Sequence, residues 1–264
     1  MIKLIAIDLD GSLLSDDKQL PKDFWNVVNQ LFEKNITVVI ASGRPLSNVI
    51  SVFAEIKDKL YFACDNGSFV MHANEEILVS PIGRDALKSF IEISRPIKDS
   101  YPVLCGKEQA YIENEEEEFS RQALKYYQKY ELVKDLTTVE DTIVKISFCD
   151  LRGSEENSYP FYKHYENDYN VAISGQVWLD ITNKTASKGN AIKEIQRRLN
   201  ISASETLVFG DYLNDLDMIE NAGYSYAMKN AHPDILKAAK YITDLDNNEG
   251  GVTATICKLL DLNP

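Results

Sequence analysis

The sequence predicts an α/β protein with a doubly wound parallel sheet and an inserted α+β domain. Apolar runs of strand length at residues 2–7, 37–41, 60–64 and 206–209 alternate with segments of helical periodicity. Continuous apolar runs are typical of strands that are covered on both faces. The alternation of strand and helix therefore favours parallel strands joined by right-handed crossovers.

The first half of the chain has one helix between each pair of these strands. A helix is expected within residues 21–34, where apolar side chains recur at helical spacing. Pro45 can open a second helix after the strand at 37–41. Apolar runs at 69–71 and 77–79 then flank a polar turn, as in a hairpin.

The pattern changes between residues 82 and 184, where short strands mix with helices. Helical periodicity occurs at 85–93, 116–128 and 158–169, and strand patterns occur at 110–112, 143–148, 171–173 and 177–181. We expect residues 82–184 to form an inserted domain, with residues 1–81 and 185–264 forming the parallel core.

The parallel pattern resumes with a helix that begins at Lys188 and leads into the strand at 206–209. Two further short strands are expected at 224–228 and 241–243, with a helix from Pro233 between them. A last helix carries apolar residues at 252, 256, 259 and 260.

Composition excludes several classes of protein. The formal net charge is -13, from 28 basic and 41 acidic residues, which argues against nucleic acid or an anionic membrane as a partner. The four cysteines are widely spaced and include no CxxC pair, so reduced thiols are favoured over a zinc site. The N-terminus opens directly into a strand, and no apolar run approaches membrane-spanning length, so we expect a cytoplasmic protein.

Polar residues stand where the predicted parallel strands end. Asp8 and Asp10 follow the first strand, Ser42 follows the second, and the acidic stretch from Asp211 follows the strand at 206–209. In open α/β sheets, ligands bind outside the carboxyl ends of the strands. Two neighbouring carboxylates need a metal ion, a Lys or Arg, or a shared proton, and all three remain possible at this point. Each motif alone is weak, but their order is specific.

In that order, the sequence resembles the haloacid dehalogenase-like hydrolases, and specifically the large-capped, Cof-type phosphatases. The resemblance is carried by Asp8-Leu9-Asp10-Gly11-Ser12-Leu13-Leu14, Ala41-Ser42-Gly43-Arg44-Pro45, Asp65-Asn66-Gly67, Ser187-Lys188-Gly189 and Gly210-Asp211-Tyr212-Leu213-Asn214-Asp215. It implies a Rossmann-like core with a cap inserted in it. Ser12 stands where the family commonly has Thr, and Tyr212 replaces a more usual small polar residue.

The resemblance implies a role for each matching residue. Asp8 would be the nucleophile, and Asp10 would act first as acid and then as base. Mg²⁺ would be held by the Asp8 carboxylate, the Asp10 backbone carbonyl and Asp211. Phosphate would be bound by the Leu9 backbone amide, Ser42, Gly43, Lys188 and Asn214, with Asp215 supporting the metal or orienting Lys188. For Arg44, a structural ion pair and a substrate contact stay equally open.

These roles agree with the chemistry of the residues. Carboxylates are covalent nucleophiles in phosphoryl transfer, and a cation and a lysine neutralise the charge of the transferring group. The sequence and the resemblance together predict a Mg²⁺-dependent phosphatase of small phosphorylated metabolites, as a monomer or homodimer. The resemblance implies sugar phosphates, FMN or pyridoxal phosphate as candidate substrates. The rival functions are a phosphomutase on the same core and a silent phosphate-binding or sensing protein.

Overall fold

The computed structural model describes residues 1–127 and 129–263. Two residues lie outside this description. Gln128 is the last residue of the helix predicted at 116–128, and Pro264 is the last residue of the predicted core domain. The chain divides into two compact units. The core unit comprises Met1–Gly43, Phe53–Leu78 and the chain from Ser187 onward, and the cap unit comprises Arg44–Val52 and Val79–Ala186. The boundaries that the sequence suggests, with an inserted domain at 82–184, remain a prediction.

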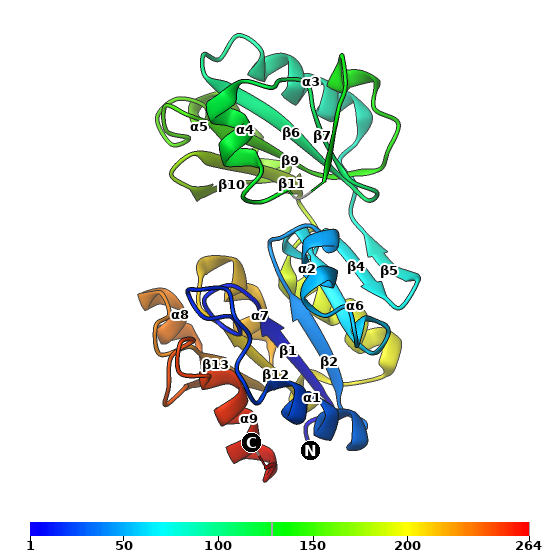
Figure 1. Cartoon of the computed structure of the whole chain (residues 1–264), viewed down its shortest axis with the longest axis vertical. Coiled ribbons are helices and arrows are strands. Elements are labelled where there is room, and N and C mark those ends of the chain that lie inside the picture. The colour runs from blue at the N-terminus through cyan, green and yellow to red at the C-terminus, as the bar shows by residue number, and fades with distance from the viewer. Residues whose placement is uncertain (128, 264) are drawn as a thin grey trace. The chain divides into compact units, whose positions relative to one another are not determined.

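The core unit is built on one sheet with the strand order β14-β13-β12-β1-β2-β3-β4-β5 (Figure 1). Its strands are β1 (Leu4–Asp8), β2 (Thr37–Ala41), β3 (Tyr61–Cys64), β4 (Phe69–His72), β5 (Glu75–Val79), β12 (Thr206–Gly210), β13 (Tyr224–Ala227) and β14 (Tyr241–Ile242). The strands from β14 to β3 run parallel, and β4 pairs with β3 antiparallel. All residues of β1 and β12 are buried, as their apolar runs predict.

Helices lie between the parallel strands of the core unit along the chain, and one more helix, α9, follows the last strand. They are α1 (Phe24–Glu33), α6 (Lys188–Leu199), α7 (Leu216–Asn221), α8 (Pro233–Ala238) and α9 (Gly251–Leu260). Helix α1 buries Phe24, Val27, Val28 and Leu31, which form the predicted apolar stripe. Helix α7 was not expected, because six residues are too few to show a helical period. The predicted mixed α/β fold with a parallel sheet is confirmed.

The cap unit has its own sheet, with the strand order β10-β11-β9-β6-β7-β8. Its elements are α2 (Leu46–Val52), α3 (Arg84–Ser94), β6 (Ser100–Gly106), β7 (Ala110–Ile112), α4 (Glu117–Ala123), β8 (Tyr130–Leu132), β9 (Ile143–Asp150), α5 (Tyr159–Tyr162), β10 (Tyr169–Gly175) and β11 (Trp178–Asn183). Alternate residues of β6 enter different clusters, Leu104 packing with Phe90 and Val103 with Phe119. Apolar side chains therefore cover both faces of this sheet.

Several sequence expectations for the cap unit need correction, among them the helix expected at 116–128, of which α4 ends at Ala123, and strand β8, which was not expected. The helix predicted at 158–169 ends at Tyr162, continues as a 3₁₀ turn over Lys163–Asn167, and gives way to β10 at Tyr169. Tyr165 and Tyr169 both pack edge-on against Phe90, which explains their apolar spacing. Strand β6 was missed because Pro102 interrupts its pattern, although Pro102 pairs with Phe148 in the sheet.

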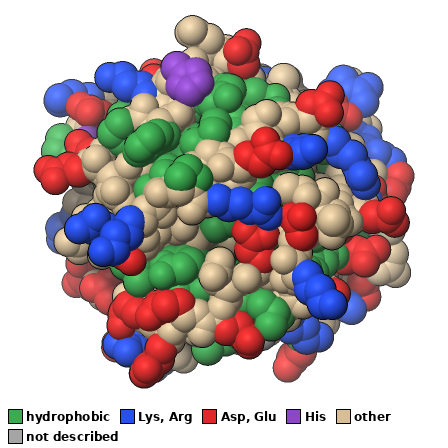
Figure 2. Space-filling view, turned by 90° about the horizontal axis from the view of Figure 1, so that it is seen from above, with side chains coloured by type: hydrophobic (Ala, Val, Ile, Leu, Met, Phe, Trp, Pro, Cys, Tyr) green, Lys and Arg blue, Asp and Glu red, His purple; other side chains and the backbone are tan. Residues whose placement is uncertain are grey.

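Two findings bear on the composition. All four cysteines are buried and free, as expected for reduced thiols. Over residues 1–127 and 129–263, no helix has the length and apolar character needed to cross a bilayer. On the face shown in Figure 2, acidic and basic side chains are interspersed, and no broad basic patch is visible on it.

Candidate active site

The site lies at the carboxyl edge of the parallel sheet in the core unit. Strand β1 ends at Asp8, Ser42 follows β2, and Asp211 follows β12. Because β1 lies between β2 and β12 and runs parallel to both, these three positions fall at the same edge. Asp8 and Ser42 are buried there.

Lys188, the first residue of α6, brings a positive charge to this edge. Its Nζ atom lies 2.6 Å from Asp8 Oδ1 and 2.6 Å from Asp215 Oδ1, and its side chain is fully buried. Burial lowers the pKa of Lys188, but the charges of Asp215 and Asp8 outweigh this effect and raise it above its ordinary value. Lys188 is therefore held in its charged form.

Asp215 fixes the loop that follows β12. Its Oδ2 atom accepts hydrogen bonds from the backbone amides of Asp211 (2.9 Å) and Tyr212 (3.2 Å), while Oδ1 accepts from Lys188. Both carboxylate oxygens of Asp215 are thus engaged with the protein. This arrangement suits a residue that orients Lys188 and the Asp211 loop.

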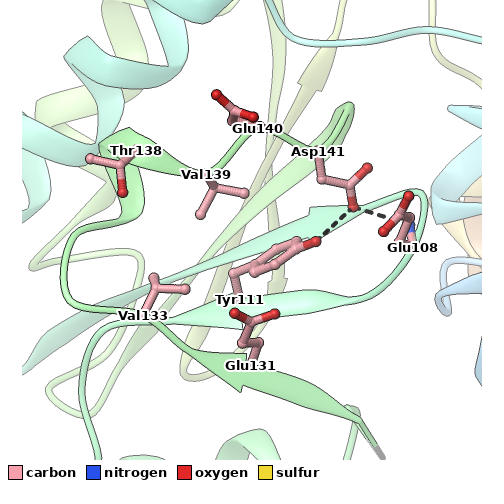
Figure 3. Close-up of a pocket in the computed structure, with 8 residues that line it drawn as sticks. All are labelled: Glu108, Tyr111, Glu131, Val133, Thr138, Val139, Glu140 and Asp141. Carbon is pink, nitrogen blue, oxygen red and sulfur yellow. Dashed lines mark hydrogen bonds between the residues drawn. The ribbon is translucent and has the colours of Figure 1, made fainter.

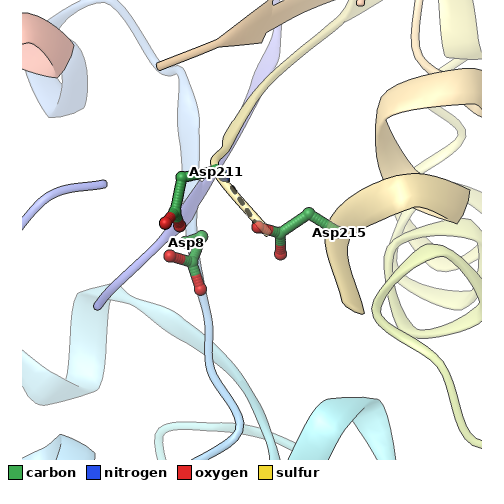
Figure 4. Close-up of side chains that lie close together, drawn as sticks. All are labelled: Asp8, Asp211 and Asp215. Carbon is green, nitrogen blue, oxygen red and sulfur yellow. Dashed lines mark hydrogen bonds between the residues drawn. The ribbon is translucent and has the colours of Figure 1, made fainter. Parts of the chain in front are cut away.

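Asp8, Asp211 and Asp215 form a cluster of carboxylates that can hold a metal ion (Figure 4). One oxygen of each lies within 4.8 Å of the others. Figure 4 shows the side chains of Asp8 and Asp211 next to each other, with the hydrogen bond from the Asp211 backbone to Asp215. Ser12 Oγ also donates a hydrogen bond of 3.2 Å to Asp211 Oδ1, which holds that carboxylate in place.

The electrostatics of this cluster favour a divalent cation. Burial raises the pKa of Asp8 well above its usual range, and the charge of Asp215 raises it further while Lys188 partly offsets both. Burial and the charge of Asp215 also raise the pKa of Asp211 to about 6. Three carboxylates face one ammonium group, so a divalent cation would neutralise the remaining charge.

The donor set also fits Mg²⁺. The residues are oxygen ligands, which hard cations prefer. Asp8 Oδ2 is buried and has no hydrogen-bond donor among the described residues, so this oxygen is available to a cation or a substrate. Since Asp215 is fully engaged, Asp8 and Asp211 are the side chains best placed to bind the ion.

The side chain of Asp10 points to a different partner. Its Oδ1 atom accepts a hydrogen bond of 2.8 Å from Lys18 Nζ, and both side chains are partly exposed. No sequence pattern predicts this ion pair, because Lys18 reaches Asp10 through a loop in which Lys18 itself has a positive φ of 62°. An exposed pair of this kind is weak and readily exchanged.

The remaining predicted residues are divided between the two units. Asn214 lies on the Asp211 loop, where its Nδ2 atom donates a hydrogen bond of 3.0 Å to Asn66 Oδ1. Leu9 is buried directly after Asp8, and Gly43 ends the first segment of the core unit. Arg44, the next residue, is the first residue of the cap unit. Asn66 was singled out only as part of a motif, without a role.

The cap unit contains a separate cavity of about 410 Å³ (Figure 3). It is lined by Glu108, Tyr111, Glu131, Val133, Thr138, Val139, Glu140 and Asp141. Figure 3 shows the Tyr111 hydroxyl turned towards Asp141, to which it donates a hydrogen bond of 3.2 Å. The lining includes four carboxylates and no lysine or arginine, which makes this cavity unsuited to a phosphate ester.

Comparisons with known proteins agree with the site. The family model of the haloacid dehalogenase-like hydrolases matches residues 5–256. The chain is 32% identical to the 5-amino-6-(5-phospho-D-ribitylamino)uracil phosphatase YbjI of Escherichia coli, over 94% of this chain and 93% of the relative. It is 28% identical to the phosphatase YwpJ of Bacillus subtilis, over 98% and 100%.

A solved structure of the same family has the same fold. A haloacid dehalogenase-like hydrolase from B. subtilis superimposes with a TM-score of 0.85 at 25% identity, covering 98% of this chain and 100% of that one. The carboxylate cluster, the buried lysine and the parallel sheet thus occur in a chain that matches the family over nearly its whole length. The chain belongs to the haloacid dehalogenase-like hydrolases and is a phosphatase of phosphomonoesters.

Proposed function

We propose that the protein is a Mg²⁺-dependent phosphatase that hydrolyses small phosphomonoesters through an aspartyl-phosphate on Asp8. One observation supports the proposal most strongly. Buried Lys188 contacts Oδ1 of the buried Asp8 carboxylate, while Asp8 Oδ2 has no hydrogen-bond donor among the described residues. This arrangement leaves Asp8 an oxygen for attack while Lys188 holds the other.

In the first step, the Asp8 carboxylate attacks phosphorus, and the bond from phosphorus to the leaving oxygen breaks. Asp10 gives its proton to that oxygen, so the alcohol leaves neutral. Lys188 offsets the charge on the transferring group. A Mg²⁺ ion held by Asp8 and Asp211, with the Asp10 backbone carbonyl as the family resemblance suggests, would supply further charge neutralisation at the phosphoryl oxygens.

In the second step, Asp10 takes a proton from water, and the water oxygen attacks phosphorus. The bond to Asp8 breaks, which releases orthophosphate and restores the carboxylate. Asp10 serves as acid and then as base, which one residue can do because the two displacements are separate. Before these steps, Asp10 would leave its exposed ion pair with Lys18 and turn to the substrate.

The phosphate itself would be bound by groups from four segments of the core unit. Ser42 and Gly43 would contribute from the end of β2, Lys188 from the start of α6, and Asn214 from the loop after β12. The Leu9 backbone amide would add a donor next to the nucleophile. Together these groups would position the phosphoryl group for in-line attack.

For the substrate, we favour sugar phosphates or phosphorylated cofactors such as FMN or pyridoxal phosphate. The relative YbjI is named for a substrate with a phosphorylated ribityl chain, and FMN carries a chain of the same kind. From the sequence, we also propose that the protein is cytoplasmic and that it is a monomer or a homodimer.

The test uses orthophosphate release from p-nitrophenyl phosphate and FMN, with Mg²⁺ and with a chelator. The wild-type protein should be active only with the metal. Asp8→Asn should lower kcat by at least about a thousandfold, because the covalent path is lost. Asp58→Asn, which changes an exposed aspartate in a turn of the same unit, should leave kcat unchanged.

Each rival function has its own outcome in this test. Orthophosphate released in amounts equal to the substrate rules out a phosphomutase, which would keep the phosphoryl group on its product. A folded protein that releases no orthophosphate from any ester with any divalent cation would instead support a silent binding protein. Wild-type turnover by Asp8→Asn would refute the nucleophile.

A further inference from the structure

The turn Asp65–Gly67, which follows β3, touches the segments that the proposed function assigns to phosphate binding. The Asn66 backbone amide donates a hydrogen bond of 3.0 Å to the Ser42 carbonyl. Its side-chain Oδ1 accepts a hydrogen bond of 3.0 Å from Asn214 Nδ2. The same Oδ1 atom lies 3.0 Å from the place that a Cβ atom on Gly43 would occupy.

The next residue of the turn lies against the start of α6. A Cβ atom on Gly67 would be 2.2 Å from the Ser187 carbonyl oxygen and 3.0 Å from the Lys188 backbone nitrogen. The turn thus contacts Ser42 and Gly43, the side chain of Asn214, and the start of the helix that carries Lys188. No other role in the reaction has been assigned to it.

The backbone of this turn lies in the left-handed region, which few residues adopt. Three consecutive residues have positive φ values: 48° at Asp65, 56° at Asn66 and 82° at Gly67. Asn tolerates this left-handed region better than most residues, and Gly tolerates it best. In this conformation, the Asn66 side chain bonds to Asn214 while its backbone amide bonds to the Ser42 carbonyl.

Building on the proposed function, we propose that Asn66 is a positioning residue for the phosphate site. By accepting one of the two Nδ2 hydrogens of Asn214, Asn66 fixes the rotation of that amide. The second hydrogen then remains available to a phosphoryl oxygen. Asn66 therefore acts through Asn214, without touching the reacting atoms.

The test replaces Asn66 with Gly, which keeps the left-handed backbone and removes the amide side chain. The matched control is Asn35→Gly, because Asn35 has the same φ of 56° and is exposed after α1. Both variants change Asn to Gly at a positive φ, so any shared loss reflects the backbone. The readouts are KM and kcat for p-nitrophenyl phosphate and the inhibition constant of orthophosphate.

Asn66→Gly should raise KM and the inhibition constant of orthophosphate together by about 3- to 10-fold, the usual effect of one lost polar contact. The kcat value should change by less than about 3-fold, since the interaction serves ground state and transition state alike. Asn35→Gly should change neither constant. In the Asn214→Ala background, adding Asn66→Gly should cost less than about 2-fold more, because the two residues act as one unit.

Three results would overturn the inference. Constants for Asn66→Gly that equal those of Asn35→Gly would remove the role of its side chain. Effects of Asn66→Gly and Asn214→Ala that multiply in the double variant would show that Asn66 does not act through Asn214. A Tm for Asn66→Gly far below that of Asn35→Gly would mark Asn66 as a residue of the fold alone.

These failures are separate from a failure of the proposed function. If the wild-type protein hydrolyses phosphate esters and Asn66→Gly behaves like its control, only the role of Asn66 is wrong. If the wild-type protein neither hydrolyses p-nitrophenyl phosphate nor binds orthophosphate, the proposed function is wrong, and the role of Asn66 falls with it.

Discussion

The ammonium group of Lys188 lies 2.6 Å from Oδ1 of Asp8, and solvent reaches almost none of either side chain. This contact joins the end of β1 to the start of α6, two segments 180 residues apart in the chain. Because Lys188 also contacts Asp215, a single cation is shared by two buried carboxylates. The site and the fold of the core unit therefore depend on the same group.

Replacing Lys188 with Met should abolish hydrolysis and destabilise the protein. The change leaves Asp8 and Asp215 buried without their counter-charge, and breaking a buried ion pair from one side costs about 3 to 5 kcal/mol. Denaturant unfolding at pH 7 measures the loss. Lys193→Met, on the exposed side of the same helix, should lower the free energy of unfolding by less than about 0.5 kcal/mol. Equal stabilities for the two variants would contradict the assigned role of the buried charge.

The affinity for Mg²⁺ should fall in acid. Burial, together with Asp215, raises the pKa of Asp211 to about 6, so protons compete with the cation for this carboxylate below that pH. The affinity should fall by at least about tenfold per pH unit below pH 6, because the pKa of Asp8, the other proposed carboxylate ligand, is raised as well. Calorimetric titration from pH 5 to pH 8 measures this slope. A constant affinity over that range would exclude Asp211 as a ligand.

The same pKa gives a prediction for the stability of the metal-free protein. The Asp211 pKa rises from 3.8 to about 6 on folding, so between these values the folded state binds more protons than the unfolded state. The contribution of this carboxyl to stability is therefore fully present below pH 3.8 and is lost as the pH rises through about 6. Comparing Asp211→Asn with the wild-type protein in chelator isolates the effect: the variant should gain stability relative to wild type between pH 5 and pH 7.

The hydroxyl of Ser12 should matter for metal binding because it donates to Asp211 Oδ1. Ser12→Ala should weaken the apparent Mg²⁺ affinity by about tenfold, the lower end of the range for groups that orient a metal ligand. Ser12→Thr keeps the hydroxyl and should stay within about threefold of the wild-type affinity. The Mg²⁺ dependence of orthophosphate release measures both. If both variants lost Mg²⁺ affinity to a similar extent, the hydroxyl would not be what matters at this buried position.

Gly67→Ala should destabilise the core unit strongly. The residue has a φ of 82°, and a Cβ atom there would meet the Ser187 carbonyl at 2.2 Å. Gly250 is the control, because its φ is 74° and its nearest neighbour would be 3.4 Å from a Cβ atom. Both substitutions carry the cost of a left-handed Ala, about 1 kcal/mol, and Gly67→Ala should lose about 2 kcal/mol more through the clash. Equal unfolding free energies would show that α6 can move aside.

The fold was predictable where burial leaves a simple pattern. β1, β2, β3 and β12 are continuous apolar runs because both faces of the sheet are covered. Elements that depend on their surroundings were harder: β6 contains Pro102, and α7 is too short to show a period. The predicted helix at 158–169 failed because its aromatic residues serve packing against Phe90.

The site divides in the same way. Asp8, Ser42 and Asp211 could be placed at one edge from the sequence, since the ends of parallel strands lie together. The pairing of Asp10 with Lys18, and of Asn66 with Asn214, could not be found in this way. Both depend on loops in which Lys18 and Asn66 have positive φ values, and those dihedral angles set side-chain directions that no periodicity reveals. The catalytic roles themselves stay predictions.

The order of strands in the core sheet has a consequence for biosynthesis. β1 lies between β2 and β12, and β12 is translated only after the whole cap unit. While the chain is still emerging from the ribosome, β1 therefore waits with one edge unpaired, whereas the cap sheet already has all its strands. We expect protease resistance in stalled nascent chains to appear in the cap unit first, and in the N-terminal strands only after Gly210 has emerged.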